Sequence, residues 1–175
     1  MSALPWFALA RLLPLARGGP VPFAALASSP ITSAYFALAD DAAPLPDDGP
    51  VVALPAGDPF HFILRTPGAD ARRFALLAGG NRAFDGMPVA AIEAAARAQL
   101  ATLYPGFAAA TPATVRIRKE QLATFVAAPG SRAARPAPGP LPGGPTNLLV
   151  CGDWTASGLP STLEGAARSA EMVLD

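Results

Sequence analysis

The chain has 175 residues, 51% of them apolar, which is enough for one domain or one and a half small ones with a sizeable core. Thirteen basic residues balance thirteen acidic ones without a long run of either sign, so nucleic acid is not an expected partner. The single cysteine, Cys151, excludes an internal disulfide, and the single histidine, His61, has no cluster of metal ligands around it. These features favour a reducing, cytoplasmic location and give no metal site.

Residues 4–15 are apolar, but Arg11 interrupts the run, which is too short to span a bilayer. No basic region or small-residue cleavage site frames it as a signal peptide. We therefore expect a buried or half-buried helix here. A shallow peripheral contact with the inner face of the membrane is left open, because one helical face would gather apolar side chains at Trp6, Phe7, Leu9, Leu12 and Leu13.

Proline and glycine, with 21 and 16 copies, cluster at residues 18–22, 44–50 and 134–145, and these joints are the expected loops between secondary-structure elements. Between and after the first two joints, residues 30–38, 59–65 and 73–78 are rich in β-branched and aromatic side chains. They predict antiparallel strands of one sheet. His61 lies in the second run, where a structural role is favoured over catalysis.

The clearest helix prediction covers residues 88–103, with Pro88 suited to its first turn and Pro105 ending it. Glu93 and Arg97 are four residues apart and should form an ion pair. An apolar stripe follows helical spacing at Val89, Ile92, Ala96, Leu100 and Leu103.

Residues 115–119 alternate apolar and basic side chains, which predicts a strand with one solvated face carrying Arg116, Arg118 and Lys119. Residues 122–126 form a second short apolar run. Residues 134–145 show no periodicity and are interpreted as an ordered or mobile connector.

Residues 146–151 form a continuous apolar run, typical of a strand buried on both faces of a parallel sheet. The strand ends at Gly152 and Asp153, and ligands of open α/β sheets bind beyond the carboxyl ends of strands. Cys151 is expected to be a small core residue. Asp153 is the strongest functional candidate, because a carboxylate directly after a buried strand needs a partner.

Residues 158–160 predict a turn, and Ser161 to Glu164 match a capping box that starts a helix running to about Leu174. The free N–H groups at its start would suit a phosphate or the pyrimidine edge of a flavin. Gly165 would let the helix pack closely against a neighbour, with a core face at Leu163, Ala167, Ala170 and Val173 or Leu174. From the residues alone, a cofactor site and plain packing of an αβ unit explain this pattern equally well.

Residues 149–170, LVCGDWTASGLPSTLEGAARSA, resemble the C-terminal FAD motif of the amine oxidase and phytoene desaturase superfamily. Within it, Gly-Asp-Trp-Thr, Gly-Leu-Pro-Ser-Thr and Glu-Gly-Ala are most similar to the hydroxysqualene dehydroxylase family. Residues 118–130, the pair Arg135-Pro136 and the strand around residues 29–31 also resemble that family. Ala170 departs from it, since glycine is usual there.

The resemblance implies an FAD cofactor, with Gly152 and Asp153 near the ribityl and pyrophosphate groups and residues 159–162 by the flavin ring. It implies a long apolar isoprenoid substrate, most similar to hydroxysqualene, and matches no catalytic residue. The cofactor-binding residues it predicts are Gly152, Asp153, Trp154, Gly158, Leu159, Pro160, Ser161 and Thr162.

The family's Gly-x-Gly-x-x-Gly motif, which binds the ADP half of FAD, does not occur in the sequence. We therefore expect an α/β fold of mixed type: a partial substrate-binding domain over residues 1–127, a connector over 128–145, and the last strand, turn and helix of a Rossmann-like FAD-binding domain over 146–175. The partner would be a separate or missing N-terminal FAD-binding half, and the chain alone is expected not to hold FAD. Enzymatic activity, a non-catalytic remnant or subunit, and a phytoene desaturase-like or amine oxidase activity all remain open.

Overall fold

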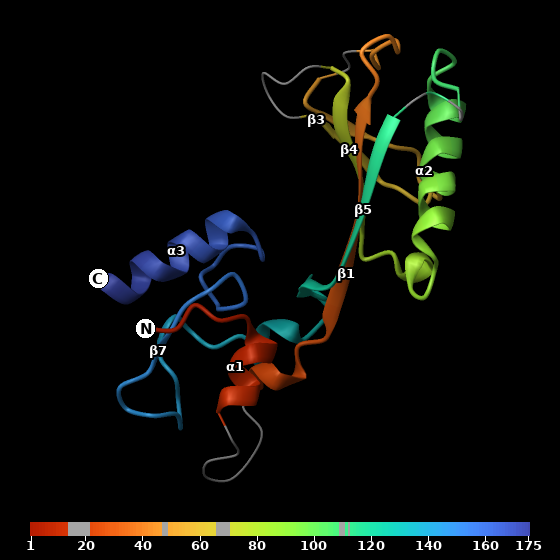
Figure 1. Ribbon diagram of the computed structural model, residues 1–175. Coiled ribbons are helices and arrows are strands. Elements are labelled where there is room, and N and C mark those ends of the chain that lie inside the picture. The colour runs from red at the N-terminus through yellow and green to blue at the C-terminus, as the bar shows by residue number, and fades with distance from the viewer. Residues whose placement is uncertain (14–21, 47–48, 66–70, 109–110, 112) are drawn as a thin grey trace. The chain divides into compact units, whose positions relative to one another are not determined.

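The computed structural model describes residues 1–13, 22–46, 49–65, 71–108, 111 and 113–175 (Figure 1). The chain forms two compact units, Ser29–Ala123 and, together, Met1–Ser28 with Thr124–Asp175. Helices combine with one five-stranded and one two-stranded sheet, which confirms the mixed α/β class. The division into substrate-binding and FAD-binding parts stays a prediction, and residues 1–28 belong to the same compact unit as the C-terminal segment.

The unit of residues 29–123 is built on the five-stranded sheet, whose strand order is β2-β3-β4-β1-β5. Strands β1 and β4, and β4 and β3, pair antiparallel, as predicted. Strand β2, which was not predicted, pairs antiparallel with β3. The strands are β1 (Ser28–Leu38), β2 (Val51–Ala53), β3 (Phe62–Arg65), β4 (Arg73–Gly79) and β5 (Ala113–Phe125).

Strand β3 begins three residues later than the apolar run predicted, because the backbone of Phe60 is bound by a side chain. The Gln99 Oε1 atom accepts from the Phe60 N–H at 3.0 Å, and Gln99 Nε2 donates to the Phe60 carbonyl at 2.9 Å. This pairing also satisfies an amide that is only 7% exposed. His61, next along the chain, is half-buried with its ring edge-on to Phe62.

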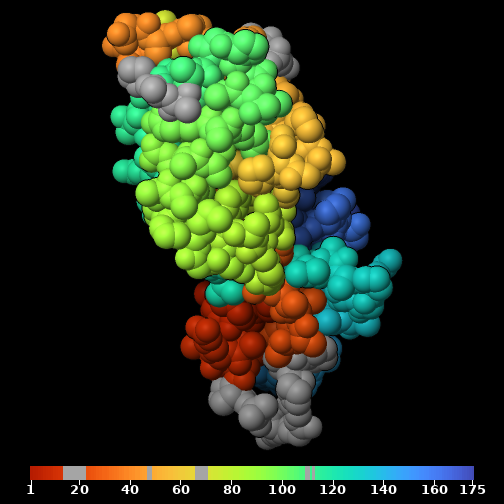
Figure 2. Space-filling view, turned by 90° about the vertical axis from the view of Figure 1, so that its right-hand side faces the viewer, coloured from red at the N-terminus to blue at the C-terminus, as the bar shows by residue number. Residues whose placement is uncertain are grey.

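Helix α2 (Val89–Leu103) covers one face of this sheet, and Figure 2 looks onto the outer side of that helix. Pro88 is its N-cap, as proline's fixed φ allows, and Pro105 follows its end. Ile92, Ala96 and Leu100 are fully buried, which confirms the central part of the predicted stripe. Val89, at the first turn, is 56% exposed.

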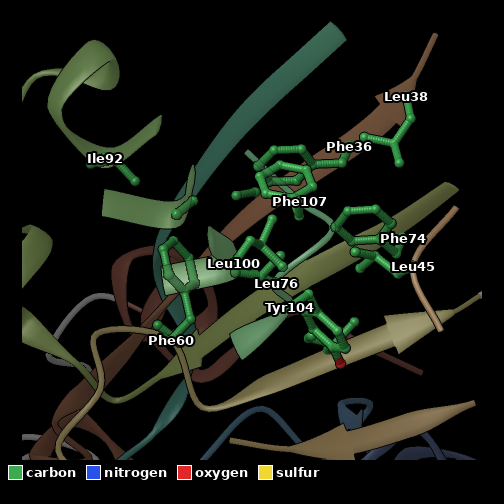
Figure 3. Packing of buried hydrophobic residues seen from close by; sticks show 14 of the residues in the cluster. Phe36, Leu38, Leu45, Phe60, Phe74, Leu76, Ile92, Leu100, Tyr104 and Phe107 are labelled. Atoms are coloured by element: carbon green, nitrogen blue, oxygen red, sulfur yellow. The ribbon is translucent and has the colours of Figure 1, made fainter. Parts of the chain in front are cut away.

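The core between α2 and the sheet is aromatic (Figure 3). Phe36 on β1 and Phe74 on β4 are paired across the strands and stack at 5.1 Å between ring centroids. Phe107 meets Phe36 edge to face at 6.3 Å. Such ring pairs stabilise a core beyond the area that they bury.

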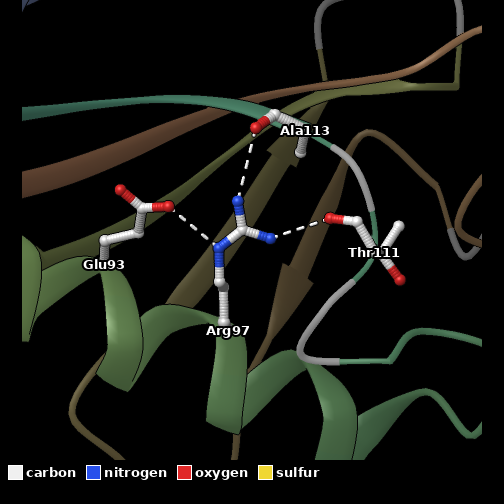
Figure 4. A network of polar contacts seen from close by, with 4 residues as sticks. All are labelled: Glu93, Arg97, Thr111 and Ala113. Atoms are coloured by element: carbon white, nitrogen blue, oxygen red, sulfur yellow. Dashed lines mark hydrogen bonds and ion pairs between the residues drawn. The ribbon is translucent and has the colours of Figure 1, made fainter.

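Arg97 joins α2 to the segment that leads into β5 (Figure 4). Its guanidinium pairs with Glu93 at 2.9 Å, as predicted, and donates to the carbonyls of Thr111 at 2.9 Å and Ala113 at 3.3 Å. It also lies 5.8 Å from the centre of the Phe36 ring. One guanidinium therefore joins helix α2 to two backbone carbonyls at the start of β5.

Strand β5 shows the predicted alternation, with Arg116 and Arg118 exposed. One expectation here is wrong. Lys119 does not lie on the solvated face, because its ammonium donates to the Met87 carbonyl at 3.1 Å. Most of the second apolar run, residues 122–126, belongs to the same strand, which continues unbroken to Phe125.

The second unit begins with α1 (Trp6–Leu12), as predicted, followed by a 3₁₀ turn, η1 (Pro22–Ala25). Trp6 and Leu9 are buried in a cluster with Phe23, Leu26, Phe125, Leu141, Val150 and Trp154. Of the five side chains considered for membrane contact, two are thus buried and two more, Phe7 and Leu13, pack partly against the same cluster, whereas Leu12 is 66% exposed. No helix within the described residues combines the length and apolar character needed to cross a membrane.

The proline-rich stretch is ordered: η3 (Ser131–Ala134) precedes β6 (Gly139–Pro140), and Leu141 is buried. Strand β6 pairs antiparallel with β7 (Leu149–Val150). The prediction of a six-residue strand in a parallel sheet is therefore wrong, apart from one parallel bridge between Ser2 and Val150. The strand is short because the Leu148 N–H bonds the Pro145 carbonyl in a turn.

We predict that Leu100→Ala destabilises the chain by about 2–5 kcal/mol, because it leaves a cavity in a fully buried site. Val89→Ala on the same helix is the matched control and should cost about 0.5 kcal/mol or less. Urea unfolding followed by circular dichroism measures both. Equal losses for the two variants would show that α2 does not pack through Leu100.

Candidate cofactor-binding turn

The turn after β7 begins at Gly152, whose backbone conformation requires glycine. Its φ is +143°, and a Cβ atom there would lie 2.7 Å from the Trp154 indole nitrogen. The Gly152 carbonyl accepts from the N–H of Thr155 at 3.0 Å and from its hydroxyl at 2.7 Å. Residues 152–155 thus close a tight turn at the end of the strand, as the Gly-Asp pair predicted.

Trp154 anchors this turn from the inside. Its side chain is fully buried and lies 4.9 Å from the Phe23 ring centre, with the two rings tilted by 48°. Its Nε1 donates to the Leu4 carbonyl at 3.0 Å. The indole of this predicted cofactor residue therefore belongs to the core, and only its backbone is available to a ligand. Cys151 is likewise a buried core residue, as expected.

The Asp153 carboxylate has the partner that its position required. Its Oδ2 atom accepts a short hydrogen bond from the Ser161 hydroxyl, which in turn lies 2.9 Å from the hydroxyl of Thr124. Thr124 is a site residue that the sequence reasoning missed. The only signal for it was that it lies within the second segment that resembles the family.

Helix α3 (Leu163–Leu174) is capped by Thr162, not by Ser161, so the predicted capping box is wrong. The Thr162 hydroxyl accepts from the Gly165 N–H at 3.1 Å. The Ser161 hydroxyl is instead turned toward Asp153, to which it donates. Pro160, just before, ends the turn against the helix, and a Cβ atom on Gly165 would collide with its carbonyl oxygen.

The predicted core face of α3 is also wrong. Leu163 is 92% exposed and Leu174 is 76% exposed, whereas the buried positions are Gly165 and Ser169. The Ser169 hydroxyl accepts from the Gly152 N–H at 2.7 Å and donates to the Ala166 carbonyl at 2.6 Å. Small side chains on this face let the helix approach the turn closely.

Seven N–H groups of residues 152–164 have no hydrogen-bond acceptor among the described residues: those of Asp153, Trp154, Gly158, Ser161, Thr162, Leu163 and Glu164. The last two lie in the first turn of α3, where the helix dipole adds partial positive charge. Beside them, the Asp153 carboxylate can accept from hydroxyl groups. This donor and acceptor set fits the phosphate, ribityl and pyrimidine groups of a flavin nucleotide.

Arg135, in the ordered connector, lies behind the turn. Its Nε donates to the Trp154 carbonyl at 3.2 Å, and its Nη2 reaches the carbonyls of Asp153 at 3.0 Å and Leu159 at 3.2 Å and makes a short bond to that of Thr155. Burial lowers the pKa of this guanidinium, and the Asp153 carboxylate opposes the shift. No role was predicted for Arg135 beyond its place in the resemblance.

The remaining predicted residues, Gly158 and Leu159, line an open groove of about 510 Å³ between residues 157–159 and α3. Glu164, Arg168 and Glu171 line its other side, and Arg168 lies 3.5 Å from Glu171. The structure thus brings all eight predicted residues into one loop and helix start. Their contact with FAD stays a prediction.

Comparison with known proteins defines the class. The sequence pattern of the family described as flavin containing amine oxidoreductase matches residues 58–173, and the chain belongs to this family. Membership implies a flavin and an FAD-dependent oxidoreductase, and it confirms the resemblance on which the site was predicted.

Two curated relatives carry a more particular name. The chain is 50% identical over 56 residues to a hydroxysqualene dehydroxylase of Sinorhizobium fredii, covering 32% of this chain and 13% of that protein. It is 45% identical over 60 residues to a hydroxysqualene dehydroxylase of Rhodopseudomonas palustris, covering 34% of this chain and 14% of the relative. The matched segments are thus a small part of either relative's length.

We predict that Thr162→Ala lowers stability by about 1 kcal/mol and shortens α3, because the N-cap hydrogen bond is lost. Ser161→Ala is the matched control on the neighbouring residue and should leave the helix content unchanged. Circular dichroism and thermal unfolding measure both variants. A larger loss of helix in Ser161→Ala would restore the capping box that the sequence suggested.

Proposed function

We propose that the chain is the C-terminal part of an FAD-dependent enzyme that converts hydroxysqualene to squalene. The observation that carries the proposal is the turn of residues 152–162, where unpaired N–H groups and a carboxylate lie together at a capped helix. The family match and the names of the two relatives support the same assignment.

In this proposal Gly152, Asp153 and Trp154 hold the cofactor through their backbone and the Asp153 carboxylate, while residues 158–162 lie near its ring. The reduced flavin would supply a hydride to the carbon whose hydroxyl leaves, with a proton, as water. The protein's own part is to bind and orient the cofactor and the substrate and to exclude water from them. No residue is assigned as an acid, because none is matched to that role.

The second support is an apolar patch on strands β1, β3 and β4 in the unit of residues 29–123, beside the exposed Arg116 and Arg118 of β5. On the sheet face opposite α2, Tyr35 is 49% exposed and Phe62 is 44% exposed, and their cross-strand neighbours are Ala75 and Leu77. A surface of this kind suits a substrate with almost no polar groups. We propose that it contributes to the isoprenoid site, and that an N-terminal FAD-binding half completes the enzyme.

The test uses this chain joined to an N-terminal FAD-binding half. The purified protein should retain flavin and, when reduced without oxygen, convert hydroxysqualene to squalene, which gas chromatography with mass spectrometry detects. One squalene should form for each flavin oxidised. A colourless protein, or turnover of an amine or a phytoene-like substrate but not of hydroxysqualene, would overturn the proposal.

Asp153→Asn should weaken FAD binding about 10- to 100-fold, since it removes the charge from a hydrogen bond acceptor placed for the cofactor's hydroxyls. Asp85→Asn is the control, because that carboxylate is surface-exposed and pairs only with Arg82 among the described residues. Fluorescence titration with FAD measures both dissociation constants. Equal affinities for the wild type and Asp153→Asn would remove Asp153 from the site.

A further inference from the structure

We propose that Arg135 is a positioning residue for the cofactor, which holds the turn of residues 152–159 in its binding conformation through the carbonyl oxygens of that turn. This inference rests on the proposed function. It concerns a residue that lies behind the turn and was not among the predicted binding residues.

The first observation is the number of carbonyls that converge on one cation. Asp153, Trp154, Thr155 and Leu159 all direct their carbonyl oxygens at Arg135. Four oxygens with partial negative charge would repel one another without a cation between them. The guanidinium therefore holds together a backbone conformation that the turn would otherwise lose.

The direction of these carbonyls sets the direction of the amide hydrogens. In a trans peptide the C=O of one residue and the N–H of the next point to opposite sides. Since the Asp153 carbonyl faces Arg135, the Trp154 N–H faces away from it. That N–H has no acceptor among the described residues, so Arg135 presents it for a ligand.

Arg135 is itself fixed on three sides. Its guanidinium lies 5.2 Å from the centre of the Phe125 ring, and its backbone N–H bonds the Arg132 carbonyl at 3.2 Å. The next residue, Pro136, accepts from the Ala156 N–H at 2.8 Å. A planar, stacked guanidinium can serve several acceptors at once, which an ammonium group on a flexible stem does less well.

The test compares Arg135→Lys and Arg135→Ala with Arg132→Ala in the complete protein. Arg132 is the matched control, because it is an exposed arginine three residues earlier whose side chain makes no hydrogen bond among the described residues. Three quantities are measured: the FAD dissociation constant, the visible spectrum of the bound flavin, and the thermal unfolding temperature.

We expect FAD binding to weaken about 10- to 100-fold in Arg135→Ala and less in Arg135→Lys, with a shifted flavin spectrum in both. Arg132→Ala should match the wild type. If both Arg135 variants bind FAD with the wild-type affinity and spectrum, this inference is wrong even if they unfold at lower temperature. If the wild-type protein itself holds no flavin, the proposed function fails first and this inference with it.

Discussion

The hydrogen bond from the Gly152 N–H to the Ser169 hydroxyl is the constraint on which the C-terminal site depends. It joins the end of β7 to the middle of α3, so the loop between them must bring the helix back against the end of the strand. Gly165 allows that return, because it brings the helix against the Pro160 carbonyl without a clash. Thr162, the last residue of the loop, then caps the N-terminus of the helix. The loop that carries the unpaired N–H groups is therefore held at both of its ends.

Local chemistry made much of the fold predictable. The strands β1, β3 and β4 and helix α2 follow from apolar runs bounded by proline and glycine, and the Glu93 to Arg97 pair follows from helical spacing. The turn at Gly152 and Asp153 was predictable because glycine is the residue type that adopts a positive φ without steric cost. In each of these cases, neighbours in the sequence determine the structure.

The predictions are wrong where a contact with a residue distant in the sequence determines the local structure. Ser161 and Thr162 are both good caps, and only the position of Asp153 determines which hydroxyl remains free for the helix. Helix α3 buries Gly165 and Ser169 and leaves Leu163 exposed, because close approach to the turn required small residues and not large apolar ones. The role of Arg135 could not be predicted, since converging backbone carbonyls leave no pattern in side-chain types.

The central claim is that the N–H groups of Asp153 and Trp154 face the flavin. Amide hydrogen exchange in the complete protein, resolved to single residues and measured with and without FAD, tests it most directly. The account predicts slower exchange at both amides when FAD is bound, with no change at Leu76 in the core of the other unit. Unchanged exchange at Asp153 and Trp154 in a protein saturated with FAD would contradict it.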